Sequence, residues 1–468
     1  MKTITTFLLL CLSCIGYAQI DTVLFNQVSS IQFPFLQFKS SYTSLFDQNN
    51  SSYLYSANKE YGVGIYDISV TGTITPVKDY LPDSLNNIDV TAIKQSGNYL
   101  FVGLGDYQDT TNVSSGLAII DISNPASAFI TDIWDSTAFD EGVTHILIEG
   151  NYAYLSIMGN GLVILNIANK NDIQFVSQLV PDLTFPAVSA GHHQGRGMDF
   201  RNDTLFFCFD RGGLRIIDVS VKSAPVELYK YINNTLISTA VAAYNDVKVK
   251  GNYAFVSVDY CGMEILDISS TPYSPVQWYN PWGCNTVNWN GADLHANELI
   301  FEHNDSLLFM AAGNSELLVF DVSDPLNTTK VGEFLDLNNG YATYGLDVKG
   351  NKVSLSYVNS FFDIPFVGNW GGLKLLDYTT LMVGIGEQEV EKPTTIFPNP
   401  GKTNFTVKAK SVINRIEIYD FVGRKVKTIT DINASSVNVN ISDLICGVYM
   451  VDITLQQGNS RLKLVKDE

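Results

Sequence analysis

The chain has 468 residues, with 48 acidic side chains against 29 basic ones and a formal net charge of −19. This excess of carboxylates disfavours nucleic acid as a partner, because phosphate backbones repel it. A chain of this length also exceeds what one ordinary hydrophobic core supports, so we expect several domains or an array of repeats.

The first eighteen residues have the pattern of a secretory signal peptide. Lys2 precedes the apolar run 7–15, and small residues stand at Gly16 and Ala18. We therefore predict cleavage between Ala18 and Gln19. The apolar run is shorter than the roughly 20 residues that cross a bilayer, and no later stretch of the chain reaches that length. We expect no transmembrane segment.

Two of the six cysteines, Cys11 and Cys14, lie within this leader. A lipoprotein anchored through Cys14 is the alternative, but Cys11 stands where such leaders usually carry an aliphatic residue. Four cysteines remain, too few for a disulfide framework in a long chain. Cys261 and Cys284 have loop-like surroundings, and we predict a disulfide between them. Cys208 lies in an apolar strand-like segment, and the fourth is Cys446.

One short phrase recurs along the chain, with spellings such as "LAIIDIS", "LRIIDVS" and "LLVFDVS". Its acidic or amide position repeats every 45 to 56 residues, at Asp67, Asp121, Asn166, Asp218, Asp267, Asp321 and Asp377. A period near 50 that contains only strand-like segments is typical of a β-propeller or another all-β array.

Each unit reads as four short strands, as in residues 245–279, with "GN" as a hairpin turn. In the third strand of one unit, Leu214 and Ile216 point to one face, and Ile217 and Val219 point to the other. Both faces are apolar and must be covered. Sheets packed face to face around a ring meet this need, so we predict an all-β fold, a seven-bladed β-propeller over residues 19–381.

The last unit lacks an obvious fourth strand, while residues 23–38 precede the first unit without a partner. We predict that this early segment closes the ring as the outer strand of the last blade. The recurring Asp ends a strand just before a turn, where a carboxylate can accept backbone N–H bonds. Asn166 keeps the acceptor without the charge, which favours this turn role over catalysis.

The phrase resembles the LVIVD repeat of exported bacterial propeller-like proteins, over about 360 residues. The resemblance implies the fold but no particular function, because propellers serve in binding, scaffolding and catalysis alike.

A polar, Glu-rich linker is predicted over residues 382–395, followed by a small β-sandwich over 396–468. The elements "FPNP", "IYDFVGRKV" and "DLICGVYMVDI", followed by a Lys-ending finish, resemble the C-terminal sorting domain of the type IX secretion system. This resemblance implies a partnership with that secretion machinery, export through the periplasm and across the outer membrane, and either attachment to the cell surface or release. An Ig-like binding module with the same pattern is the alternative.

In a four-stranded blade, the loops from strand two to three and from strand four to the next blade share one face of the ring. Several such loops are long, at 105–116, 180–197, 278–297 and 359–372. His192, His193, His295 and the strand residue His145 map to this face, whereas His303 maps to the opposite one. The charged neighbours that could join them are Asp106, Arg196, Asp210, Arg211 and Asp259.

These side chains could bind a ligand, hold a metal or move protons. No zinc or calcium motif is present, so no metal site and no cofactor are assigned. Four tryptophans share the same loops and suit sugar rings or a protein partner, or else cap the blades: Trp278, Trp282, Trp289 and Trp370. We expect a surface protein that binds a protein or glycan, the alternative being a secreted hydrolase or lyase with a His/Asp site.

Overall fold

A computed structural model describes residues 20–33, 40–106, 114–187, 193–236, 243–280, 295–302, 304–313, 316–335, 340–360, 368–382, 394–420, 423–456 and 459–467. The chain divides into two compact units, Met1–Val383 and Gly384–Glu468. Within the described part, the structure is built from β-strands with three short 3₁₀ turns at Pro82–Ser84, Pro125–Ser127 and Met158–Asn160. That part has no helix long and apolar enough to cross a membrane.

Five antiparallel sheets of four strands follow one another along the first unit. The first two sheets are β2 (Thr43–Phe46), β3 (Tyr53–Ala57), β4 (Val63–Asp67), β5 (Thr75–Tyr80), and β6 (Val90–Ser96), β7 (Tyr99–Leu104), β8 (Ser115–Asp121), β9 (Phe129–Ser136). The third is β10 (Val143–Glu149), β11 (Tyr152–Ile157), β12 (Gly161–Asn166), β13 (Gln174–Leu179). The fourth and fifth are β14 (Met198–Arg201), β15 (Thr204–Cys208), β16 (Leu214–Asp218), β17 (Val226–Tyr231), and β18 (Tyr244–Lys250), β19 (Tyr253–Val258), β20 (Met263–Asp267), β21 (Ser274–Tyr279).

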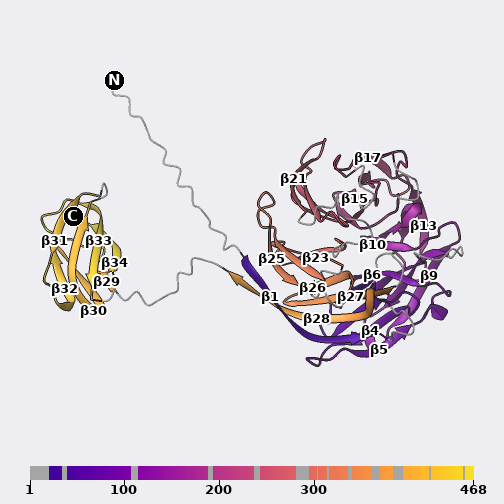
Figure 1. Ribbon diagram of the computed structural model, residues 1–468, viewed down its shortest axis with the longest axis horizontal. Helices are drawn as coiled ribbons and strands as arrows, with labels where there is room; N and C mark the ends of the chain where they lie inside the picture. Colours follow the sequence, from indigo (N-terminus) through magenta and orange to yellow (C-terminus); the bar gives the residue numbers. More distant parts are fainter. Residues whose placement is uncertain are drawn as a thin grey trace, which may run out of the picture. The chain divides into compact units, whose positions relative to one another are not determined.

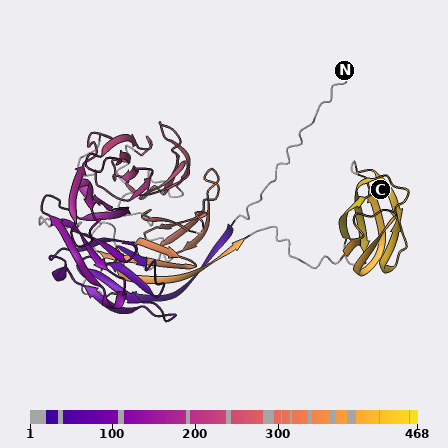
Figure 2. The same cartoon turned by 180° about the vertical axis from the view of Figure 1, so that it is seen from behind.

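The remaining strands of this unit form one eight-stranded sheet that divides into two sets of four. One set is β22 (Leu299–Glu302), β23 (Leu307–Ala311), β24 (Leu317–Asp321) and β25 (Thr329–Phe334); the other is β26 (Thr343–Lys349), β27 (Lys352–Ser360), β28 (Gly368–Met382) and β1 (Ile20–Gln32). The β-propeller fold is therefore present, with the sheets arranged around a ring (Figures 1 and 2). The count of seven blades stays a prediction from the repeat. Five sheets of four strands and two further sets of four are compatible with it.

The N-terminal strand β1 closes the last sheet, as the unpaired early segment predicted. It runs antiparallel to β28 from the pair Ile20–Met382 to the pair Gln32–Gly372, and the two strands lie side by side in Figure 1. β1 begins three residues earlier than predicted and also contacts β25 in parallel, where Val23 pairs with Gly332. A Cβ on Gly332 would lie 2.8 Å from the Val23 Cβ, so this close approach needs glycine.

The core of the propeller lies between neighbouring sheets. Leu214 and Ile216 of β16 are buried in a cluster shared with the following sheet, and Ile217 and Val219 are buried in a cluster shared with the preceding sheet. The third strand is thus covered on both faces, as predicted from the apolar residues on each of its faces.

The recurring acidic position fixes a turn. The side-chain oxygen of Asp218 accepts the backbone N–H of Ser220 at 2.8 Å, and Asn166 makes the same bond to Ala168 at 2.9 Å. The other copies with this bond are Asp67, Asp121, Asp267 and Asp321. Asp377 differs, since its carboxylate pairs with Lys352 at 2.8 Å.

The second unit is a small β domain with its own core. Its strands are β29 (Thr394–Phe397), β30 (Asn404–Tyr419), β31 (Lys425–Ile429), β32 (Ala434–Asn440), β33 (Gly447–Leu455) and β34 (Asn459–Lys466). The long strand β30 pairs with β29, β31, β32 and β33 along its length, so it connects the whole domain.

Candidate functional site

The first strand of each sheet contacts the first strands of its neighbours, from β2 round to β26 and back to β2. These strands therefore form the wall of the central channel of the propeller. At the mouth of this channel, the loop after the second strand of a sheet joins the next sheet through an isolated backbone β-bridge. Asp210 forms such a bridge with Tyr244, and Asp259 forms one with Ala296.

Arg196 lies at this mouth, where backbone hydrogen bonds fix its position. Its N–H donates to the carbonyl of Cys208, and the N–H of Gly197 donates to the carbonyl of Asn245. The flanking glycines allow this approach, because a Cβ on Gly197 would lie 2.1 Å from an Asp246 carboxylate oxygen and one on Gly195 would lie 2.4 Å from Ser156 Oγ.

The Arg196 side chain connects opposite parts of the ring. Its guanidinium forms an ion pair with Asp210 at 3.1 Å, bonds to Gln194 Oε1 at 3.2 Å and donates to the hydroxyl of Tyr344. Burial raises the pKa of Tyr344. Since Tyr344 belongs to β26 and Arg196 immediately precedes β14, in a non-adjacent sheet, their contact spans the channel mouth.

Asp259 and His295 form a buried pair beside this contact. The Asp259 Oδ1 lies 3.1 Å from His295 Nδ1, and the two residues are 4% and 3% exposed. The ring of Tyr260 packs on the imidazole with centroids 4.2 Å apart. Burial raises the pKa of Asp259, which His295 and Arg196 partly oppose. A carboxylate on Nδ1 fixes the orientation of an imidazole, as in general-base sites.

The channel wall below the mouth carries carboxylates that join successive sheets. Each accepts a backbone N–H from the first strand of the next sheet: Asp199 from Val249 at 2.6 Å, Asp246 from Leu299 at 2.9 Å, Glu298 from Leu346 at 3.0 Å and Asp347 from Phe46 at 2.7 Å. The last of these bonds joins the final sheet to the first.

Several of these wall groups have shifted pKa values. Burial, with nearby Asp246, raises the pKa of Glu298 to about 7, and burial raises that of Asp347 to about 6. His145 also lies in this wall, deeper than predicted, and its pKa is well below the usual value because of burial and then of Lys248 and Lys94. These carboxylates were not predicted from the sequence, where their only signal is an acidic residue in or next to the first-strand segment of four units.

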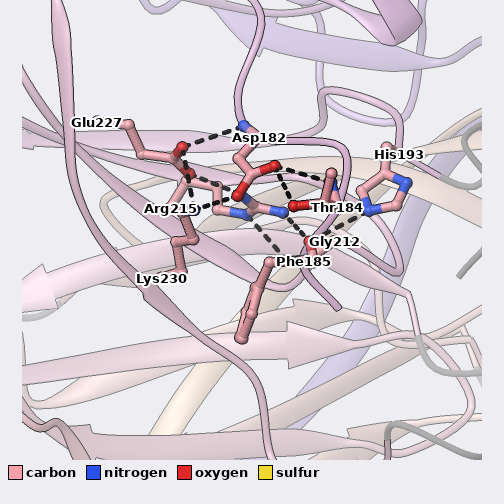
Figure 3. Close-up of polar contacts among 8 residues, drawn as sticks. All are labelled: Asp182, Thr184, Phe185, His193, Gly212, Arg215, Glu227 and Lys230. Atoms are coloured by element: carbon pink, nitrogen blue, oxygen red, sulfur yellow. Dashed lines mark hydrogen bonds and ion pairs between the residues drawn. The ribbon is translucent and has the colours of Figure 1, made fainter. Parts of the chain in front are cut away.

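His193 belongs to a different cluster. Its Nε2 lies 3.2 Å from the carbonyl oxygen of Phe185, and it is 1% exposed. Figure 3 shows it beside Arg215, whose buried guanidinium pairs with Glu227 at 2.6 Å and donates to the carbonyls of Gly212 and Phe185. The His193 ring also packs on Phe209, in the loop after β15, with ring centroids 5.7 Å apart. His193 is therefore part of a buried cluster that holds the loop between the third and fourth sheets.

The two described tryptophans from the candidate set pack against the blades. Trp278 donates its indole N–H to the carbonyl of Cys261 at 2.7 Å. The ring of Trp370 lies 4.9 Å from Tyr357 and 5.7 Å from the Lys374 ammonium. Both contacts fit the alternative in which these tryptophans cap the blades. Neither contact involves Arg196 or its partners.

The remaining predicted site residues include Arg211 and the cysteines. Arg211 follows Asp210 and is half-buried. Cys261 is disulfide-bonded, whereas Cys208 and Cys446 are free. Positions outside the described residues are Ala18, Gln19, His192, Trp282, Cys284, Trp289 and His303, so the pairing of Cys261 with Cys284 stays a prediction. Among the described residues, no group of three His, Cys, Asp or Glu side chains is placed to hold a metal ion.

The fold defines a β-propeller followed by a small β domain, and the family matches agree. Residues 89–135, 142–179, 206–233 and 243–277 match the LVIVD repeat. Residues 395–467 match the family described as secretion system C-terminal sorting domain. The chain therefore contains LVIVD repeats and ends in a type IX sorting domain, which implies secretion.

Solved structures with similar folds have low sequence identity. A chain of a mitotic checkpoint complex has 13% identity and a TM-score of 0.50, covering 79% of this chain and 98% of its own length. The β-propeller domain of Cps50 (Swd1) from Myceliophteria thermophila has 11% identity, a TM-score of 0.49 and coverages of 76% and 100%. The computationally designed Ika8 protein has 12% identity, a TM-score of 0.45 and coverages of 75% and 99%. No curated protein matches the chain.

Proposed function

We propose that this chain is exported through the periplasm by type IX secretion to the cell surface or the medium, where its propeller binds a protein or glycan at the channel mouth. The observation that carries the binding proposal is the convergence of Arg196, Asp210, Asp259, His295 and Tyr344 from separate sheets. Convergent polar groups at a ring mouth are the usual form of a propeller ligand site.

The chemistry of the mouth favours hydroxyl-rich ligands. Arginine, carboxylate, imidazole and phenol groups all form hydrogen bonds with sugar hydroxyls, and rings such as Tyr260 offer flat apolar faces. The acidic excess of the chain disfavours polyanionic glycans. We therefore place neutral glycans first among the ligands.

A glycan array probed with the purified full chain tests this proposal. Arg196→Gln removes the charge that spans the mouth and should weaken binding at least about tenfold. The matched control is Arg201→Gln, since Arg201 ends the first strand of the same blade and bonds to Gly251 at the opposite end. Binding that survives Arg196→Gln, or falls equally in both variants, would reject the mouth as the site.

The Asp259–His295 pair supports a second candidate function, a secreted hydrolase or lyase in which His295 acts as a base. Asp259→Asn would disturb the orientation of the imidazole and reduce turnover more than ligand affinity. The assay is release of new chain ends from polysaccharides on which the wild-type chain is active. A kcat unchanged in Asp259→Asn would eliminate this candidate.

A further inference from the structure

The sorting domain has an apolar patch on the outer face of its sheet. Strand β33 alternates as a two-faced strand should: Tyr449 and Val451 are 4% and 0% exposed in the core, whereas Val448 and Met450 are 43% and 36% exposed on the other face. An outward face is normally polar, so apolar residues at consecutive outward positions need an explanation.

Neighbouring strands extend this patch. Tyr419 of β30 stands opposite Met450, and Val465 of β34 stands opposite Val448. We call Tyr419, Val448, Met450 and Val465 the tail patch. A contiguous exposed apolar group on a small domain marks an interaction site.

The other end of the same face is charged. Asp452 pairs with Arg461 at 2.6 Å, and Glu417 pairs with Arg415 at 2.6 Å. Glu417 also pairs at 3.0 Å with Lys425, which stands opposite Tyr419 at the edge of the patch. These exposed pairs resemble an ordinary solvated surface. The apolar character is therefore confined to the end near Met450.

Charge distinguishes the possible occupants of the tail patch. Residues 396–468 carry 10 Lys and Arg against 7 Asp and Glu, whereas residues 19–383 carry 17 against 38. Lys463 stands opposite Met450 at the edge of the patch. Complementarity favours an apolar partner surface with a carboxylate rim, and it disfavours a second copy of the domain, which would bring like net charges together.

We infer that the tail patch is the face by which the export machinery holds this domain, through an apolar surface rimmed by carboxylates. This inference rests on the proposed type IX export. The partner covers Val448 and Met450 while Lys463 pairs with its acidic rim. The charged end of the face stays outside the contact.

Export of the full chain from a host with a type IX system tests the inference. Met450→Glu puts a carboxylate into the patch and should lower the exported fraction about tenfold, with the protein retained in the periplasm. Thr454→Glu is the matched control, because Thr454 is exposed on the same face of the same strand, at its far end. It should be exported like the wild type. Equal export of the Met450 variant, or equal retention of the control, would overturn the inference.

Further measurements distinguish a folding defect, dimerisation and a different export route from loss of the machinery contact. If Met450→Glu unfolds the domain, Lys463→Glu decides, since it changes an exposed charge only and should also reduce export. A wild-type chain that is dimeric by light scattering, with a monomeric Met450→Glu variant, would assign the patch to a second copy and refute a machinery contact. Undiminished export of a chain lacking residues 384–468 would instead refute the proposed export route itself.

Discussion

Glu298 offers a test of the channel wall because its buried charge opposes folding at neutral pH. Its pKa is raised from 4.5 to about 7, so the folded protein binds this proton more tightly than the unfolded chain. A carboxyl of this kind destabilises the fold increasingly as pH rises from about 4.5 to 7, and the effect vanishes below that range. The shift corresponds to about 3 kcal/mol at pH 8, at 1.36 kcal/mol per pKa unit.

Glu298→Gln removes the charge and keeps an acceptor for the Leu346 N–H. Relative to wild type, the variant should therefore gain stability between pH 5 and pH 8. Using about 2.1 cal/mol/K per residue over roughly 360 residues, the Tm difference should grow by roughly 3 °C between these pH values. Differential scanning calorimetry at both pH values measures this.

Glu333→Gln is the control, since Glu333 lies in the same blade in an exposed pair with Lys330. Its effect should be small and nearly equal at the two pH values. A Tm difference for Glu298→Gln that is flat or shrinks with rising pH would refute the reasoning about the wall.

Three other predictions concern closure and covalent structure. Deleting residues 20–32 removes a strand with eleven paired residues, so the Tm should fall sharply, and an unchanged Tm would refute closure by β1. Gly332→Val should destabilise the fold by about 1–3 kcal/mol in urea denaturation, because its Cβ would lie 2.8 Å from the Val23 Cβ and 2.9 Å from the Val23 carbonyl oxygen; a free energy of unfolding equal to that of the wild type would refute the close approach of β1 to β25. Alkylation of the unfolded, leaderless chain should label two cysteines before reduction and four after it, with Cys261 and Cys284 protected together, and protection of any other pair would contradict the predicted disulfide.

Much of the fold followed from the sequence because it depends on local patterns. The apolar residues on both faces of the β16 segment required two neighbouring sheets. The last unit lacked a fourth strand, and the unpaired N-terminal segment could supply it. The turn role of Asp218 also followed, since Asn166 showed that an acceptor and not a charge is needed. These features each depend on residues close in sequence or on a count of strands.

The site was harder to predict because it depends on where the ring brings distant residues. Arg196, Asp210, Asp259 and His295 were candidates, and the structure brings them together. Tyr344 was missed, since only the closed ring places it near Arg196. His193 was a candidate because of its loop position alone, and the structure buries it in the cluster of Arg215, which holds that loop from within the blade.

Hydrogen–deuterium exchange of the full chain, with and without a neutral glycan selected on the array, tests the central claim that the channel mouth is the binding site. The account predicts slower exchange at residues 193–197, 209–213 and 259–262 in the bound chain, with no change at the hairpin turns 150–151 and 251–252 on the opposite face. Protection at those turns, with none around Arg196, would contradict it.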